Sequence, residues 1–145
     1  MKTRIIMLIT GIVLSQLGTS VGTSSENSAA RDLVAAKCLA FGAVGVAGLM
    51  PEGERNLRAI LEQPDALPQL HAALAHATSA GKLYILVGLR QCDRVAYHKV
   101  FQSMACANGD VEIVRGCMIS QEPFRQVLSQ IQDGRSDDYL SRTPR

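Results

Sequence analysis

The chain has 145 residues, the length of a single domain, and hydrophobic residues make up 47% of it. Aromatic residues are only 4% and tryptophan is absent, so we expect an aliphatic core, which suits close-packed helices better than a β-sandwich. The formal net charge is only +2, which argues against the broad positive field that nucleic-acid binding usually needs.

The first 22 residues have the order of a secretory signal peptide. Lys2 and Arg4 form a basic start, residues 5–14 are apolar, and residues 18–22 are small and polar. The apolar part is shorter than the roughly 20 residues that cross a membrane, so cleavage after Gly22 is favoured over an uncleaved anchor. Removal of residues 1–22, which include Lys2 and Arg4 but no acidic residue, leaves a mature chain with 13 basic and 13 acidic residues. We therefore predict a neutral periplasmic or secreted protein that has no nucleic-acid partner and no stable membrane insertion.

The mature chain begins with a polar stretch and then a helix. Residues 23–30 are predicted to be a mobile lead-in, and a helix is expected from about residue 30 to residue 38 or 39. Residues 41–49 contain three glycines, which leaves two structures open. They predict either a small-residue helix that breaks near Gly45 or Gly48, or an extended segment that lets other backbone approach closely, and the helix is favoured.

Two amphipathic helices follow. Pro51 suits a first helical turn, with acidic residues beside it that favour the positive end of a helix. Pro64 ends this helix and leads into the next. The positions expected to face inward lie at helical spacing in both segments: Leu57, Ile60, Leu61, Leu67, Leu70, Leu74 and Ala77.

Residues 81–92 form the most apolar run outside the N-terminus, and they predict the central element of the fold. Apolar side chains fall on nearly every side of a helical wheel, which indicates a helix buried on most faces. A buried strand would fit the same run, but helical patterns flank it on both sides. Thr78 and Ser79 offer an N-cap, and Asp93 can cap a further helix that extends to Met104.

The last third combines an ambiguous segment with a clear helix. A turn is expected at Asn108-Gly109, and residues 111–119 are rich in β-branched side chains. They predict a short strand or an extended, disulfide-bonded loop, with residues 41–49 as the candidate partner. A helix follows from about residue 122 to Gly134, with Phe124, Val127, Leu128 and Ile131 inward. We predict one helical domain over residues 31–134 and a disordered tail over 135–145.

The succession of short helices over residues 51–104 resembles the helix-pair layout of HEAT-like α-repeats. The resemblance covers about a third of the chain and rests on pattern, with no specific signature and no clear internal repeat. It implies a binding surface rather than catalysis. The expected fold class is all-α, either a compact bundle or a short HEAT-like array of about five to six helices, with one small extended segment near residues 111–119.

Four cysteines remain after signal cleavage, and in an exported chain an even number predicts disulfides. The short loop that contains Asn108-Gly109 favours a Cys106–Cys117 bridge, which leaves Cys38–Cys92 as the second. In the chain-entropy model, closure of a loop this short contributes on the order of 3 kcal/mol.

The chain lacks the patterns of common catalytic and metal sites. His71 and His76 are five residues apart and so lie on different helix faces, and neither they nor His98 belong to a known metal-ligand spacing. No Gly-x-Ser-x-Gly elbow and no phosphate-binding loop is present. We therefore expect no metal, no cofactor and no enzymatic activity.

One polar cluster is a candidate contact surface. Arg90, Arg94, Tyr97 and His98 fall at helical spacing, and arginine and tyrosine are enriched where proteins bind proteins. An ordinary solvated face is the alternative. Our leading hypothesis is an exported, non-enzymatic helical protein that binds another protein, for example as an inhibitor or immunity-type factor in a bacterial envelope. One alternative is a carrier of a small apolar ligand in a pocket between helices. Another is an enzyme of unknown type, which the missing catalytic patterns disfavour.

Overall fold

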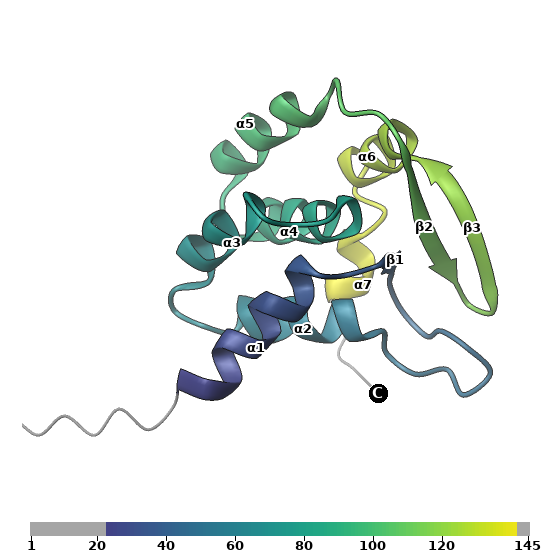
Figure 1. Cartoon of the computed structure of the whole chain (residues 1–145), viewed down its shortest axis with the longest axis horizontal. Coiled ribbons are helices and arrows are strands. Elements are labelled where there is room, and N and C mark those ends of the chain that lie inside the picture. The colour runs from purple at the N-terminus through teal and green to yellow at the C-terminus, as the bar shows by residue number, and fades with distance from the viewer. Residues whose placement is uncertain (1–22, 142–145) are drawn as a thin grey trace, which may run out of the picture.

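The computed structural model describes residues 23–141, with side chains from Ser28 onward. Within this range the chain forms seven helices and three strands (Figure 1). The helices are α1 (Thr23–Val34), α2 (Glu52–Leu61), α3 (Ala66–Leu74), α4 (Ser79–Cys92), α5 (Arg94–Met104), α6 (Phe124–Gln132) and α7 (Asp137–Ser141). The strands are β1 (Cys38–Ala40), β2 (Asp110–Arg115) and β3 (Met118–Pro123). The predicted signal peptide, residues 1–22, lies outside the described residues.

Helix α4 is the centre of the fold, as its all-round apolar pattern predicts. Its residues 83–89 are all buried, and it contacts α1, α2, α3, α5 and α6 as well as β1 and β2. The predicted N-cap is present, because the Thr78 hydroxyl accepts a hydrogen bond from the Gly81 N–H at 3.0 Å. Burial of so many aliphatic side chains on one helix makes it the main source of hydrophobic stabilisation.

The predicted inward stripes lie on the faces of the helices that cover α4. In α2 and α3, Leu57, Ile60 and Leu70 are buried, while Leu61, Leu67 and Leu74 are half-buried at the edges of the contact. All four positions predicted for the last helix are buried in α6. Helical periodicity therefore identified the buried faces of α2, α3 and α6, because each of these helices packs on the core with one side only.

The prediction of an all-α fold is wrong, because the structure contains a three-stranded mixed sheet in the order β1-β2-β3. Strand β2 pairs antiparallel with β3 in a hairpin and parallel with β1, where Leu39 lies opposite Ile113. The segment 111–119 is thus divided between two strands and the turn that joins them. Residues 41–49, the predicted partner, do not pair with β2. The parallel partner of β2 is β1, which lies just before that segment, and its antiparallel partner is β3.

The pairing of β3 explains why its sequence did not predict a strand. Nearly all of its side chains are exposed, so it lacks the alternation of buried and exposed positions that a half-buried strand shows. Its backbone bonds to β2, whose Val111 and Ile113 are buried, supply the order that its side chains do not. Strand β1 has three residues, which is too short for a periodic signal.

The glycine-rich residues 41–49 form a loop with its own narrow turn. Val44 and Leu49 exchange backbone hydrogen bonds of 2.9 and 3.0 Å, and Gly48 N–H bonds back to Gly45 at 3.2 Å. Gly45 and Gly48 have φ of +68° and +60°, a conformation that disfavours any residue with a Cβ. The favoured helix is therefore absent, and the alternative extended segment is present only as a tight turn over residues 45–48, in which the glycines serve the positive φ angles rather than a close approach.

The predicted disulfides are a second error, because all four cysteines are free in the structure. Cys106 follows α5 at the start of the hairpin, whereas Cys117 lies in the turn at its far end, so the six residues of β2 separate them. The turn expected at residues 108–109 does not bring Cys106 and Cys117 together, because the chain reverses at Gly116-Cys117 instead. Cys38 lies in β1 near the middle of α4, and Cys92 is the last residue of that helix.

Helices include part of the predicted mobile lead-in and part of the predicted disordered tail, and the mobility of both segments stays a prediction. Helix α1 includes residues 23–30, and helix α7 includes residues 137–141. No helix in the described part of the chain is both long and apolar enough to cross a membrane.

Candidate functional site

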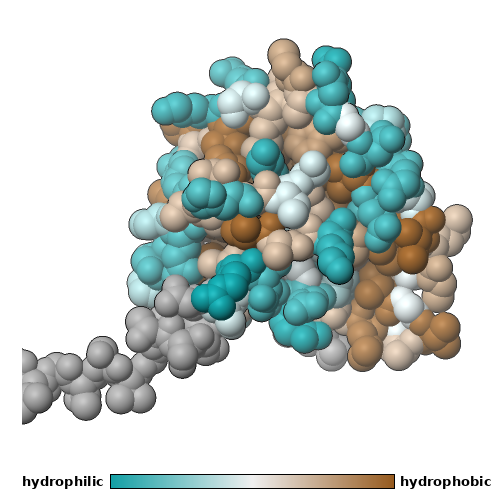
Figure 2. Space-filling view, viewed as in Figure 1, coloured by the Kyte–Doolittle hydropathy of each residue, from teal (hydrophilic) through white to brown (hydrophobic). Residues whose placement is uncertain are grey.

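Two loops that are distant in sequence meet at one end of the molecule. The Gly45 N–H donates a hydrogen bond of 2.9 Å to the Gly116 carbonyl, which joins the 41–50 loop to the turn of the β2–β3 hairpin. Four large apolar side chains project there, and we call them the apolar tip. They are Val46, Leu49, Met118 and Ile119, with exposed fractions of 100%, 65%, 75% and 68%. Figure 2 shows hydrophobic residues gathered at the side where this loop and hairpin lie.

The apolar tip escaped the sequence analysis because its parts belong to segments whose structure was ambiguous. Val46 and Leu49 lie among glycines, and Met118 and Ile119 lie in the segment predicted to be a short strand or an extended, disulfide-bonded loop. A signal was nevertheless present, since both segments are apolar and lie outside the helical patterns. The tertiary structure was needed to show that these side chains face solvent rather than the core.

The predicted cluster of Arg90, Arg94, Tyr97 and His98 is partly an internal contact. The Tyr97 ring is buried, and the Arg90 guanidinium carbon lies 5.5 Å from its centroid. Arg90 also forms an ion pair with Asp137 at 2.8 Å and donates to the Gln132 carbonyl at 3.0 Å. The hydrogen bond to Asp137 raises the pKa of Arg90, so its charge is fixed.

Arg94 and His98 are the exposed members of this cluster. The His98 ring lies against the edge of Tyr97, with centroids 5.2 Å apart, and Arg94 is exposed at the first position of α5. The contact of Arg90 with Tyr97 joins α4 to α5, and Arg90 also bonds the last residue of α6 and the first residue of α7, so both side chains have a stabilising role. A role of the cluster in protein binding stays a prediction.

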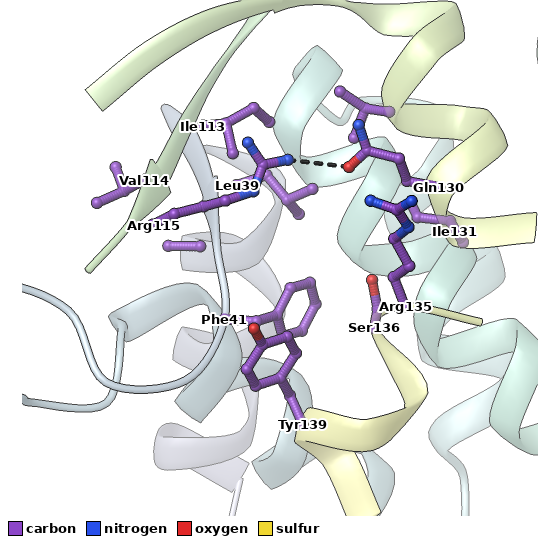
Figure 3. Close-up of a pocket in the computed structure, with 12 residues that line it drawn as sticks. Leu39, Phe41, Ile113, Val114, Arg115, Gln130, Ile131, Arg135, Ser136 and Tyr139 are labelled. Atoms are coloured by element: carbon purple, nitrogen blue, oxygen red, sulfur yellow. Dashed lines mark hydrogen bonds between the residues drawn. The ribbon is translucent and has the colours of Figure 1, made fainter. Parts of the chain in front are cut away.

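A pocket of about 200 Å³ lies between the sheet and the C-terminal helices (Figure 3). One wall comes from β1, Phe41 and the end of β2, and the other from α6 and the residues that lead into α7. Phe41 stacks on Tyr139 with centroids 6.1 Å apart, and this pair forms one end of the pocket. The lining is apolar except for Arg115, Gln130, Arg135, Ser136 and the hydroxyl of Tyr139.

Glu54 of α2 has a buried carboxylate, and both of its oxygen atoms accept hydrogen bonds. Glu54 is 2% exposed and accepts hydrogen bonds from the Gly42 N–H at 2.6 Å and from Arg58 at 2.8 and 2.9 Å. Arg58 in turn donates to the carbonyls of Tyr139 and Leu140. The pair links α2 to the glycine-rich loop and to α7. Its donors and acceptors are occupied, which points to a structural role.

The residue types that usually carry catalysis or bind metals are dispersed. His71, His76 and His98 are exposed, and within the described range no hydrogen bond or ion pair reaches their imidazoles. No group of three or more His, Cys, Asp or Glu side chains in the described residues is arranged to hold a metal ion. The apolar tip and the pocket are therefore the two candidate sites that the geometry offers.

Comparison of the chain with family models, with curated proteins and with solved structures found no match. The resemblance to HEAT-like repeats accordingly stays a prediction from pattern.

Proposed function

We propose that this protein is an exported, non-enzymatic binding protein that recognises another protein through the apolar tip. The observation that carries the proposal is the Gly45–Gly116 hydrogen bond, which joins the loop that exposes Val46 and Leu49 to the turn beside the exposed Met118 and Ile119. Single exposed hydrophobic residues are common on proteins and need no explanation. Four large ones that come from two joined loops form a patch, and such patches mark interaction sites.

The outer edge of strand β3, which lies beside the apolar tip, suggests which kind of partner segment would bind there. Strand β3 is the last strand of the described sheet, so its outer edge has no strand beside it. A partner segment in extended conformation can pair with such an edge through main-chain hydrogen bonds, while apolar side chains beside the edge add affinity. We therefore propose a partner that supplies an extended, apolar segment. An inhibitor or immunity-type role in a bacterial envelope is one that such a surface would serve.

Site-specific photocrosslinking tests this proposal. A photoreactive phenylalanine analogue is placed at Val46 or at Ile119 in the full chain, expressed in its own host and irradiated before the envelope is extracted. Val95 provides the matched control, because it is 80% exposed and lies on α5, away from the apolar tip. We expect one discrete crosslinked protein from positions 46 and 119 and none from position 95.

A second variant makes the test specific to the patch. Leu49→Asp combined with Met118→Asp keeps both loops exposed to solvent but removes their apolar character, so the crosslinked species should disappear. The absence of any protein adduct at positions 46 and 119, or the same adduct from position 95, would refute the proposal.

A further inference from the structure

The pocket between the sheet and the C-terminal helices has the composition of a ligand site. Its apolar walls belong to three elements and the residue after β1: Leu39 and Phe41 on one side, Ile113 and Val114 on β2, and Val127 and Ile131 on α6. These side chains surround a volume of about 200 Å³. A cavity of about 150 Å³ in another protein accommodates benzene, so this pocket has room for one ring or one branched chain.

Of the two arginines at the pocket, Arg115 is already neutralised. Its guanidinium pairs with the Glu122 carboxylate and donates to Gln130 at 2.9 Å. Gln130 also donates to Glu122 at 3.0 Å, which completes the group. The hydrogen bond from Arg115 lowers the pKa of Glu122, so this carboxylate is ionised at neutral pH and cancels the charge of Arg115.

Arg135 is the second arginine, and within the described residues its guanidinium has no hydrogen-bond or ion-pair partner. Asp137, the acidic residue closest to it along the following turn, is held by Arg90 at 2.8 Å. Arg135 is exposed, so the rim of the pocket has one solvated positive charge that no carboxylate of the described residues pairs with. A single charge of this kind favours a ligand with one negative charge.

Ser136 supplies a second free donor beside Arg135. It is only 7% exposed and lines the pocket, yet no residue of the described range bonds its hydroxyl. Figure 3 shows the Ser136 hydroxyl and the Arg135 guanidinium on the same side of the pocket. The Ser136 hydroxyl is thus at the wall of the pocket with no partner among the described residues, so it can bond a polar atom of a ligand there.

We propose that this pocket binds a carboxylate carried on a small apolar stem. The carboxylate accepts hydrogen bonds from Arg135 and Ser136, and a ring or branched chain of about six carbons fills the space between Ile113 and Ile131. The site is separate from the apolar tip, and it differs from the inter-helical apolar pocket expected of a carrier. The pocket lies between the sheet and α6. Because the Arg135 guanidinium has no partner among the described residues, the pocket should bind an acid more tightly than a neutral hydrocarbon.

Titration of the ¹⁵N-labelled protein with benzoate and with 4-methylpentanoate, followed by NMR, tests the site. We expect saturable shifts of the amides in residues 39–41, 113–115 and 127–136, with a dissociation constant between about 10 µM and 1 mM for ligands of this size. Benzamide and 4-methylpentanamide are the neutral controls, and they should bind at least about tenfold more weakly because a charge-assisted hydrogen bond is lost.

Matched variants assign the binding to the proposed groups. Arg135→Gln should weaken benzoate binding about tenfold or more, and Ser136→Ala should weaken it severalfold. Arg125→Gln removes an exposed arginine of α6 that does not line the pocket, so it should leave the affinity unchanged. No saturable shift with either acid, equal affinity for the amides, or an equal effect of Arg125→Gln would overturn the proposal.

The same titration separates two sources of the carboxylate. A free organic acid and the carboxyl end of a polypeptide share the chemistry, so a peptide ending in Gly-Gly-Leu is compared with 4-methylpentanoate. Tighter binding of the peptide acid than of the free acid, with loss on C-terminal amidation, identifies a polypeptide end. Tighter binding of the free acid identifies a small metabolite. Both results support the carboxylate site.

Discussion

The Tyr84 hydroxyl bonds both backbone groups of Ala40. It accepts a hydrogen bond from the Ala40 N–H at 2.9 Å and donates one to the Ala40 carbonyl at 2.7 Å, in a fully buried position. This contact fixes β1 against the middle of α4, and it thereby sets where the sheet lies on the helices. Burial also raises the pKa of Tyr84, so the hydroxyl keeps its proton and can donate.

Tyr84→Phe should therefore destabilise the protein by about 2–4 kcal/mol, because it leaves two buried backbone groups without partners. Tyr97→Phe is the matched control, since Tyr97 is also buried but its hydroxyl makes no hydrogen bond to any residue that the structure describes. We expect its stability to equal or exceed that of the wild type. Urea unfolding followed by circular dichroism measures both, and similar losses from the two variants would contradict the role of Tyr84.

Arg58→Met should cost about 2–4 kcal/mol, because the buried Glu54 carboxylate would lose its charged partner while remaining out of water. The substitution also removes the bonds to the carbonyls of Tyr139 and Leu140, so α7 should lose protection from amide hydrogen exchange. Arg55→Met is the control, because Arg55 is exposed and, among the described residues, its side chain bonds only the Met50 carbonyl, at 3.3 Å. Equal effects of the two substitutions would show that Glu54 does not need Arg58.

Two buried glycines of α4 should respond differently to alanine. A Cβ on Gly81 would lie 2.7 Å from the Leu33 carbonyl oxygen, whereas a Cβ on Gly88 would meet the ends of Leu57 and Leu70 at 2.9 and 3.0 Å. Leucine methyl groups can shift more easily than a helix backbone. Since alanine also gains about 1 kcal/mol of helix propensity, we expect Gly88→Ala to remain within about 1 kcal/mol of the wild type.

Gly81→Ala should instead lose about 2 kcal/mol or more, because α1 has to move away from α4. Differential scanning calorimetry of the two variants compares them directly. A Gly81→Ala protein as stable as the wild type would mean that the ends of α1 and α4 do not pack as closely as described.

The Arg115–Glu122 pair predicts a small acid-dependent loss of stability. The pKa of Glu122 is lowered in the folded state from its ordinary value of 4.5, mainly by the hydrogen bond from Arg115. Its contribution is therefore complete above pH 4.5 and is lost as the pH falls through the lower folded pKa. Because Arg115 is more than half exposed, the contribution should be below about 1 kcal/mol.

Urea unfolding at several pH values checks this expectation. The stability of Glu122→Gln should fall less between about pH 5 and pH 3 than that of the wild type. Glu52→Gln removes an exposed glutamate at the start of α2 and should keep the wild-type pH dependence. If the free energy of unfolding of Glu122→Gln depended on pH as that of the wild type does, the proposed contribution of the Arg115–Glu122 ion pair would be wrong.

Thiol reactivity should rank the four free cysteines. Cys106 and Cys117 are exposed and should react first with a disulfide reagent at pH 8. Burial and the neighbouring Glu112 raise the pKa of the half-buried Cys38, so its thiolate is scarce and it should react last. Peptide mapping after timed alkylation measures the order. Detection of fewer than four thiols in urea without reductant would show that a disulfide forms in solution.

The sequence by itself determined the helical part of this protein. The apolar run of residues 81–92 predicted α4, and the stripes through Leu57, Leu70 and Val127 predicted which faces are buried. These signals are local, because a helix satisfies its own backbone and shows the core one face at a fixed period. Capping at Thr78 and Asp93 was visible for the same reason.

The tertiary structure alone decided the sheet, the cysteines and both candidate sites. A strand such as β3 has no core face of its own, so its order comes from hydrogen bonds to β2. The apolar tip depends on the contact of Gly45 with Gly116, and the pocket depends on the position of Arg135 and Ser136 opposite β2. Such contacts join residues that are distant along the chain, and no local spacing encodes which distant segments will meet.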